Sequence, residues 1–158
     1  MSVARAIAVV AALGAPGCGS APGCGPHEAI VDRVIDGDTI VAGGATVRYL
    51  LVDAPEITDG HDDCYGASAA RFNADLVLGK TVELDDDAVC EDRFGRRLAY
   101  VTAGGRDVNR LLIERGYACV LHIPPDGDAR ADDFAAAEAA ARSERLGLWG
   151  ACDPVPCR

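Results

Sequence analysis

The segment that decides the fold runs from residue 28 to residue 56 and reads EAIVDRVIDGDTIVAGGATVRYLLVDAPE. It contains three hydrophobic runs rich in β-branched residues, over 28–35, 39–41 and 46–52. Asp-Gly and Gly-Gly pairs separate the runs, and both pairs favour tight turns. Three strands joined by turns this short form a β-meander.

The remaining sequence adds helices and two more strands to this meander. The predicted elements are a helix over 67–78, strands over 80–84 and 97–101, a helix over 108–115 that Asp107 caps, a short extended piece over 118–121 and a helix over about 131–145. Five strands interrupted by a helix predict an α+β fold, a five-stranded OB-type β-barrel with about three helices. We expect Leu148 and Trp149 to pack back on the barrel.

Composition narrows the class of protein. The chain has 158 residues and a mass of 16.4 kDa, which is room for one domain. Hydrophobic residues make up 49% and charged residues 25%, which excludes disordered, collagen-like and coiled-coil proteins. The formal charge of −10 makes the chain a poor general binder of nucleic acid or anionic membranes. A function on nucleic acid would therefore need a local site or a bound cation.

The N-terminus is typical of a targeting signal. Residues 1–17 read MSVARAIAVVAALGAPG, with one cation before an apolar run that is too short to span a bilayer. We interpret this segment as a signal peptide of an exported protein, with a disordered N-terminus as the alternative. Cys18 follows small residues and is a candidate for lipidation and membrane tethering, so lipoprotein and soluble export both stay open. The predicted segments are a signal peptide at 1–17, a Gly/Pro/Cys-rich tether at 18–27, a barrel domain at 28–150 and a cysteine-containing tail at 151–158.

The cysteines fit an oxidising compartment. The chain has seven, and six remain if Cys18 is lipidated or removed. These six can form three disulfides, with 15 connectivities open. The candidates are Cys24, Cys64, Cys90, Cys119, Cys152 and Cys157. No Cys-x-x-Cys pair is present, which disfavours zinc.

Acidic residues follow the first and third predicted strands. Asp36 and Asp38 lie in one turn, and Asp53 and Glu56 lie in the loop after the third strand. In a meander these two loops meet, and carboxylates brought together repel unless a cation joins them. An all-oxygen group favours Ca²⁺ or Mg²⁺ over zinc. The alternative is that these residues only form turns.

Two arginines accompany the carboxylates. Arg48 lies within the third strand, and Arg96 lies in the turn RFGRR before the fifth. Two planar cations beside a metal suit a phosphodiester and the extra negative charge of its transition state. Glu56 would then orient or deprotonate the attacking water. For Arg48 alone, the alternative is a side chain that points into solvent.

The order and spacing of several motifs identify a family. The motifs are VDRVIDGDTI (31–40), RYLLVDAPE (48–56), CYGASAA (64–70), DRFGRRLAYV (92–101), VNRLLIERGYA (108–118) and GLWG (147–150). Together they make the chain similar to the thermonuclease, or staphylococcal-nuclease-like, family over about residues 28–150. The resemblance implies an OB-fold barrel and a Ca²⁺-dependent phosphodiesterase that cleaves DNA and RNA to 3′-phosphate products.

The resemblance also implies a role for each site residue. Asp38 and Asp53 match the family's carboxylate metal ligands, and Ala54 matches a position whose backbone carbonyl is a ligand. Glu56 matches the catalytic glutamate. Arg48 and Arg96 match the two arginines that contact phosphate, and Asp36 matches an acidic residue near the metal. Phe94 stands where some members have a tyrosine, so one phosphate hydrogen bond is missing.

Alternative functions stay open at this point. One alternative is a non-catalytic OB-fold module that binds nucleic acid or a protein. Another is a phosphodiesterase for short oligonucleotides, which the acidity of the chain favours. We expect a monomer. Stacking on bases is one open role for Tyr65 and Tyr117. We expect His61 to lie in a solvated loop.

Overall fold

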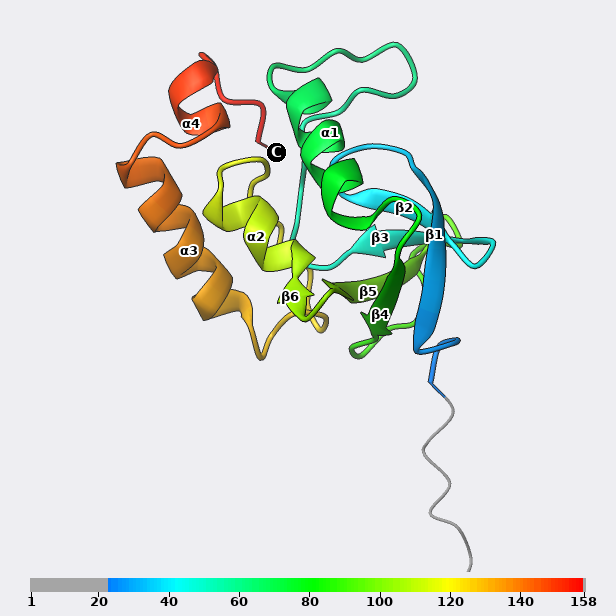
Figure 1. Cartoon of the computed structure of the whole chain (residues 1–158). Coiled ribbons are helices and arrows are strands. Elements are labelled where there is room, and N and C mark those ends of the chain that lie inside the picture. The colour runs from blue at the N-terminus through cyan, green and yellow to red at the C-terminus, as the bar shows by residue number, and fades with distance from the viewer. Residues whose placement is uncertain (1–22, 158) are drawn as a thin grey trace, which may run out of the picture.

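A computed structural model describes residues 23–157 (Figure 1). The predicted signal peptide and Cys18 lie outside the described residues. Within the described residues, no helix has the length and apolar character needed to cross a bilayer.

In the part of the chain that the structure describes, six strands form the sheet, and five of them close into a barrel. Their bounds are β1 Glu28–Val34, β2 Thr39–Ala42, β3 Ala45–Tyr49, β4 Thr81–Asp85, β5 Arg97–Ala103 and the two-residue β6 Arg106–Asp107. The strand order is β3-β2-β1-β4-β5-β6, with antiparallel neighbours. A parallel pairing of β3 with β5 closes the barrel. The five-stranded OB-type barrel is therefore confirmed, and β6 is an addition that the sequence did not predict.

An irregularity in β1 allows this strand to bend and to pair with a different strand on each side of the bend. The register with β2 shifts between Val31 and Arg33. Residues before the shift pair with β4, through Glu28 to Ile30, and those from Val31 onward pair with β2. Such irregularities bend a strand and increase its twist. One strand thus belongs to both halves of the barrel.

Within residues 23–157 there are four helices, and Figure 1 shows them on one side of the barrel. They are α1 Gly66–Val77, α2 Val108–Glu114, α3 Ala131–Ser143 and the single turn α4 Leu148–Ala151. Asp107 caps α2 as predicted, because its side chain accepts the Arg110 backbone N–H at 2.9 Å. The buried Asn109 joins α2 to the barrel by accepting the Val101 N–H and donating to the Leu50 carbonyl, both at 2.9 Å.

The third strand ends earlier than predicted. We expected it over 46–52, but β3 stops at Tyr49 and Leu51 adopts a positive φ of 61°. The Arg48 guanidinium holds the backbone of residues 49–52 in a turn. Its Nη1 donates to both the Tyr49 carbonyl at 3.1 Å and the Val52 carbonyl at 2.5 Å. Leu50 to Val52 remain buried, so their apolar character reflects core packing and not strand pairing.

The main core fills the barrel and the space beneath α1, α2 and α3. Its members include fully buried Ile40, Val47, Val101, Leu112 and Phe134. The prediction that Leu148 and Trp149 pack on the barrel is wrong. Leu148 is buried and Trp149 half-buried in a second cluster with Cys119, Cys152 and Tyr65, because the C-terminal segment is tied there.

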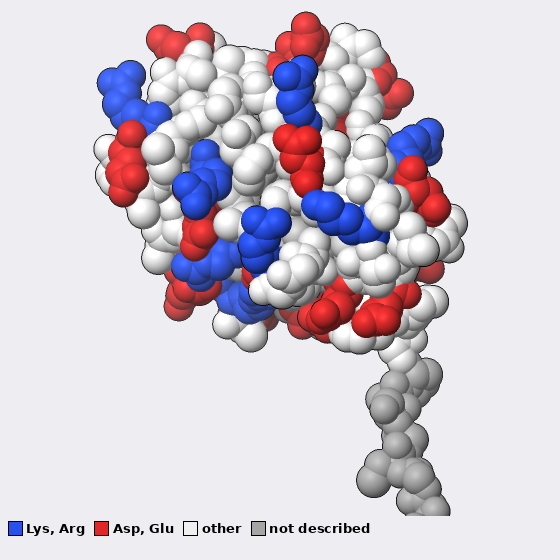
Figure 2. All heavy atoms as spheres, in the orientation of Figure 1, with Lys and Arg blue, Asp and Glu red and all other residues white. Residues whose placement is uncertain are grey.

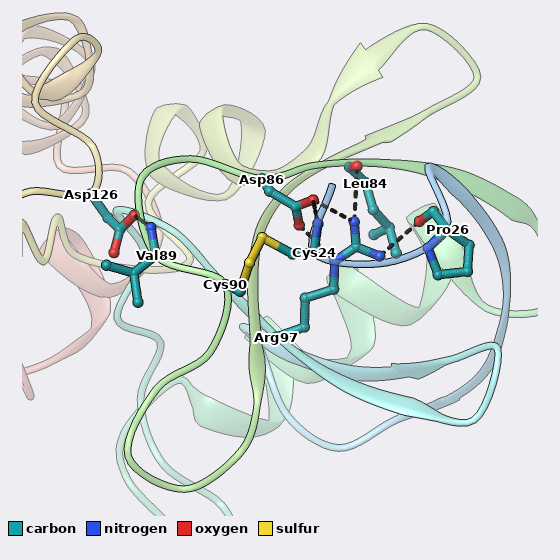
Figure 3. Close-up of a disulfide and its surroundings, with 8 residues drawn as sticks. All are labelled: Cys24, Pro26, Leu84, Asp86, Val89, Cys90, Arg97 and Asp126. Carbon is teal, nitrogen blue, oxygen red and sulfur yellow. Dashed lines mark hydrogen bonds and ion pairs between the residues drawn. A yellow bond between two sulfur atoms is a disulfide. The ribbon is translucent and has the colours of Figure 1, made fainter. Parts of the chain in front are cut away.

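Three disulfides join all six candidate cysteines. The pairs are Cys24–Cys90, Cys64–Cys152 and Cys119–Cys157. The first ties the residues before β1 to the loop between β4 and β5 (Figure 3). The other two tie the C-terminal segment to the loop before α1 and to the chain after α2.

Candidate active site

The two predicted acidic loops meet beside the N-terminal half of α1. Gly37 makes this approach possible, because a Cβ there would lie 2.5 Å from the Ala54 Cβ and 2.8 Å from the Ala69 Cβ. Asp36 and Asp38 flank this glycine and are both buried. The Asp36 carboxylate accepts the Asp38 backbone N–H at 3.0 Å, which fixes the turn. A glycine between two aspartates is therefore a packing requirement of the site.

Asp38 connects the first loop to the second. Its Oδ2 accepts the Ala54 backbone N–H at 2.6 Å, and its Oδ1 accepts the Thr39 hydroxyl at 2.9 Å. Asp53 is fixed independently, since its backbone N–H and C=O exchange hydrogen bonds with Cys119 at 2.8 and 2.9 Å. The chain after α2 thus sets the position of Asp53.

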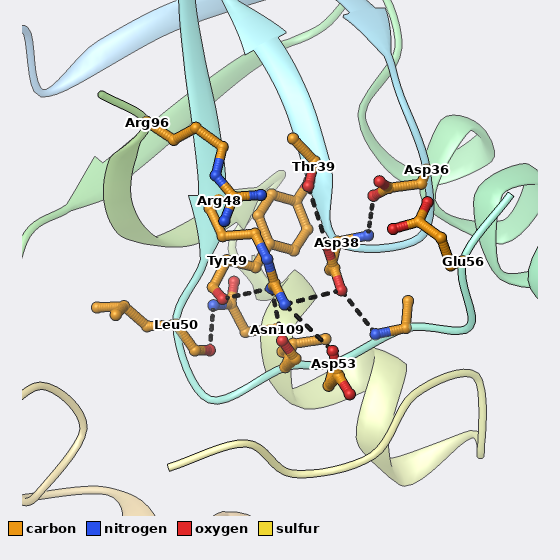
Figure 4. Close-up of polar contacts among 12 residues, drawn as sticks. Asp36, Asp38, Thr39, Arg48, Tyr49, Leu50, Asp53, Glu56, Arg96 and Asn109 are labelled. Atoms are coloured by element: carbon orange, nitrogen blue, oxygen red, sulfur yellow. Dashed lines mark hydrogen bonds and ion pairs between the residues drawn. The ribbon is translucent and has the colours of Figure 1, made fainter. Parts of the chain in front are cut away.

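Arg48 points into the carboxylate group and not into solvent. Its Nη2 lies 3.2 Å from Asp38 Oδ2 and 3.4 Å from Asp53 Oδ1, with the arginine side chain 13% exposed (Figure 4). One guanidinium therefore bridges the two predicted metal ligands. Burial raises the pKa of Asp38 to about 7, against the lowering effect of Arg48, and Asp36 raises it further. Burial is therefore the largest influence on this carboxyl group, and it disfavours the charged form.

Glu56 lies on the opposite side of Asp38 from Arg48, with its carboxylate near that of Asp36 (Figure 4). Glu56 Oε1 accepts the backbone N–H groups of Ile57 at 3.0 Å and Thr58 at 2.9 Å, and the Thr58 hydroxyl at 2.5 Å. The Glu56 N–H donates to Asp63 at 3.2 Å. The loop before α1 therefore holds this carboxylate in a fixed orientation.

Arg96 reaches the site from the turn before β5. Its Nε and Nη2 both lie 2.7 Å from Asp92 Oδ2, and Asp92 Oδ1 accepts the Arg96 and Phe94 backbone N–H groups at 3.0 and 2.9 Å. Burial acts to raise the pKa of Asp92, but the hydrogen bonds from Arg96 and Phe94 outweigh it and lower that pKa. Asp92 orients Arg96, a role that sequence analysis missed although the Asp-x-x-Gly turn was visible.

Arg48 and Arg96 line the same cavity, which has a volume of about 300 Å³. Arg48, Arg96 and Asp92 line it together with apolar side chains such as Leu98 and Leu121. A cavity of this size, with few polar groups on an apolar lining, is typical of small-ligand sites. The apolar lining from the segment after α2 carries no sequence motif, and for this reason we did not predict it.

The donor set fits a hard divalent cation. Asp38 and Asp53 already share one cationic group, and the Ala54 carbonyl supplies a further oxygen next to Asp53. Among residues 23–157, no three His, Cys, Asp or Glu side chains form a metal site by themselves. Water or substrate oxygens would have to complete the roughly six to eight ligands that Ca²⁺ takes. The oxygen chemistry of these groups favours such an ion.

Other polar residues have structural roles. Asn73 on α1 donates to the Asp36 carbonyl at 3.1 Å and accepts the Tyr49 hydroxyl at 2.9 Å, which fixes α1 to the acidic turn. His61 lies in an exposed loop, as expected. Asp86 pairs with Arg97 at 2.6 Å, so part of the acidic run after β4 is an internal ion pair.

Comparisons with known proteins identify the family of this chain. Residues 46–151 match the family model described as Staphylococcal nuclease homologue. Endonuclease YncB of Bacillus subtilis is 39% identical over 75% of this chain, and SPbeta prophage-derived endonuclease YokF of the same organism is 37% identical over 77%. The chain spans 60% and 44% of their lengths. The thermonuclease of Staphylococcus intermedius is 32% identical over 76% of this chain and 74% of its own length. The chain belongs to the staphylococcal nuclease homologue family.

Proposed function

We propose that the protein is a Ca²⁺-dependent nuclease that hydrolyses phosphodiester bonds of DNA and RNA and leaves 3′-phosphate ends. The observation that carries this proposal is the arrangement around Arg48. Its guanidinium bridges Asp38 and Asp53 and lines the same cavity as Arg96. The names of the relatives, endonuclease and thermonuclease, support the same activity.

The metal would be held by Asp38, Asp53 and the Ala54 carbonyl. When bound there, Ca²⁺ would polarise the phosphate and offset its negative charge. A cation bound there would also offset the burial that raises the pKa of Asp38. Asp36, whose carboxylate accepts the Asp38 N–H at 3.0 Å, keeps the first ligand loop in place.

The other groups act on the substrate and the attacking water. Arg48 and Arg96 donate hydrogen bonds to the phosphate oxygens, and more strongly as charge builds up on them in the transition state. The Glu56 carboxylate takes a proton from water while the water oxygen bonds to phosphorus. The bond to the 5′ oxygen breaks, that oxygen is protonated from solvent, and a 3′-phosphate remains.

The substitution Glu56→Gln tests this function. We expect kcat on single-stranded DNA with Ca²⁺ to fall by about 100-fold or more, because general-base catalysis contributes that much. Glu83→Gln, at an exposed carboxylate on β4, is the matched control and should cut as the unaltered protein does. Chelator should abolish cutting, and end-group analysis should find 3′-phosphates. Full activity in Glu56→Gln would contradict the mechanism.

Two other functions give different results in the same assay. A pure binding module would retain oligonucleotides without cutting in any metal, but it has no need for a carboxylate fixed as that of Glu56 is. A phosphodiesterase for short oligonucleotides would cleave a dinucleotide and leave long DNA intact. The acidic composition favours this second possibility, so the assay includes both substrates.

We also propose that the protein is exported, as a soluble protein or as a lipoprotein tethered through Cys18. The basic residue and apolar run of residues 1–17 support this proposal. The pairing of six cysteines supports it too, because disulfides persist in oxidising compartments.

A further inference from the structure

A second groove lies on the face of α1 and α2, outside the candidate active site. Two hollows adjoin there, and Phe72 and Tyr117 line both. Tyr65 lines the first hollow, while Leu111 and Leu146 line the second. We call this continuous feature the aromatic groove, with Tyr65, Phe72 and Tyr117 as its rings. Residues from α1 and from the turn after α2 thus form one surface.

The rings form a short stack. Phe72 and Tyr117 lie parallel, with centroids 4.1 Å apart and an interplanar angle of 10°. Tyr65 is tilted by 31° against Tyr117, with centroids 5.4 Å apart. All three side chains are half-buried, so they are held by the protein and still reach the surface. A rigid ring at a surface is a platform on which a nucleobase can stack.

Three arginines surround these rings. Arg71 lines the first hollow, and Arg106 and Arg115 line the second. All three are exposed, and within residues 23–157 their side chains form no ion pair or hydrogen bond. Most of the other arginines within the described residues are paired with acids, namely Arg48, Arg96, Arg97, Arg110, Arg130 and Arg142. Figure 2 shows basic side chains over this face, interspersed with acidic ones.

The local charge of the groove contrasts with that of the whole chain. Asp75 is the acidic residue among its lining, against three arginines, while the chain as a whole carries −10. Charges more than about 10 Å away are screened at 0.1 M salt, so the nearby arginines decide what binds. The groove is therefore complementary to an anion that also carries flat rings.

The groove begins next to the candidate active site. Tyr65 directly precedes Gly66, where a Cβ would lie 3.0 Å from the Pro55 carbonyl and 3.3 Å from the Glu56 carbonyl. The backbone beside Tyr65 therefore contacts the loop that carries Glu56. A strand that left the site on this side would meet Tyr65 first and would then pass Phe72, Tyr117 and the three arginines.

We propose that the aromatic groove binds single-stranded nucleic acid beyond the scissile bond, with bases on the rings and phosphates on Arg71, Arg106 and Arg115. The inference rests on the proposed function, since it gives that substrate a second contact. It also explains how an acidic chain can retain a polyanion. The groove adds affinity for long strands and contributes nothing to a dinucleotide that occupies the active site alone.

A charge-matched pair of double variants tests the arginines. Arg71→Ala/Arg115→Ala removes two groove cations, and Arg33→Ala/Arg145→Ala removes two exposed arginines that lie outside both hollows. Binding of a fluorescent 12-nucleotide single strand is measured by anisotropy with Glu56→Gln in all proteins, so activity is not needed. We expect the groove variant to bind about tenfold more weakly, with the slope of log K against log salt reduced by about 1.4. The control variant should bind as the parent does.

A second pair of variants tests the stacking. Tyr65→Phe keeps the ring and should bind the strand as the parent does. Tyr65→Leu should weaken binding about fivefold or more and reduce the quenching of a 2-aminopurine base in the strand. Circular dichroism checks that both variants fold. Retention of quenching in Tyr65→Leu would overturn the assignment of this ring.

The outcomes separate the groove from the catalytic proposal. If both double variants bind the single strand equally weakly, or if both bind it as the parent does, the proposed binding in the aromatic groove is wrong. This conclusion holds whether or not the protein cleaves nucleic acid. Cleavage of a dinucleotide by the unaltered protein tests the active site alone. If polyglutamate binds through Arg71 and Arg115 while the single strand does not, the groove is a site for acidic peptides and our proposal is wrong.

Discussion

At the scale of single residues, Asp38 is a carboxylate whose burial disfavours the charged form that a metal ligand needs. Its side chain is 7% exposed, accepts two hydrogen bonds and faces Arg48 at 3.2 Å. Even so, burial raises its pKa to about 7, well above the usual 3.8. A carboxylate kept in such a position is an unfavourable choice for stability alone. A site that acquires a divalent cation gives the arrangement a physical reason.

This pKa gives a prediction for the metal-free protein. Between pH 4 and pH 7 the native state holds the Asp38 proton more tightly than the unfolded state does, so stability falls as pH rises through this range. Asp38→Asn should flatten that dependence, measured as urea unfolding in chelator at pH 5 and pH 8. Added Ca²⁺ should stabilise the unaltered protein at pH 8 but not the variant. Asp32→Asn, at an exposed aspartate, is the control, and a pH dependence that Asp38→Asn leaves intact would contradict the assignment.

At the scale of elements, the loop between β4 and β5 is held from several directions. Arg97 at the start of β5 pairs with Asp86 at 2.6 Å and donates to the Pro26 carbonyl at 2.7 Å (Figure 3). Asp86 also accepts the Cys24 N–H at 3.0 Å, beside the Cys24–Cys90 disulfide. This loop carries Arg96, so the segment before β1 helps to place a candidate catalytic group.

Removal of the Asp86 charge should destabilise this connection. Asp86→Asn leaves the Arg97 guanidinium, whose side chain is 7% exposed, without its anionic partner. Breaking a buried pair costs about 3 kcal/mol, which we expect in the free energy of unfolding by denaturant. Asp85→Asn is the adjacent control at a 57% exposed side chain, and its effect should stay within about 0.5 kcal/mol. An equally small effect of Asp86→Asn would show that the pair contributes little.

At the scale of the whole molecule, the disulfides join regions that the fold alone brings together. The bridged cysteines are separated by 66, 88 and 38 residues, so each bridge closes a long loop. Such bridges stabilise mainly by restricting the unfolded chain. The C-terminal segment packs around Leu148 and Cys152, and two of the three bridges hold it.

Mass spectrometry of the protein from its producing cell tests both the bridges and export. Without reductant, we expect six paired cysteines and a chain that begins at or beyond residue 18.

Thiol reductant should lower the free energy of unfolding by several kcal/mol, since each bridge typically contributes about 2–4 kcal/mol. Several free thiols, or an intact leader on the mature protein, would contradict the proposal. A lipid mass on Cys18 would identify the tethered form.

The sequence by itself determined the features that depend on neighbouring residues, namely the β-meander and the positions of the acidic loops. The Asp-Gly and Gly-Gly turns predicted the meander, and they do so because few other pairs adopt the backbone angles of tight turns. The motifs also located Asp36, Asp38, Asp53 and Glu56, which lie in two loops that adjacent strands must bring together, and Arg48, which lies in β3 just before the second of these loops. Short-range spacing was sufficient for these features.

The tertiary structure decided everything that depends on contacts between distant segments. It selected one disulfide connectivity of the 15 that six cysteines allow. It turned Arg48 inward, because the carbonyls of Tyr49 and Val52 and two carboxylates surround its guanidinium. It also stacked Phe72 on Tyr117, 45 positions further along the chain, to build the aromatic groove. Sequence spacing cannot fix such contacts, because they form only when the whole chain packs around one core.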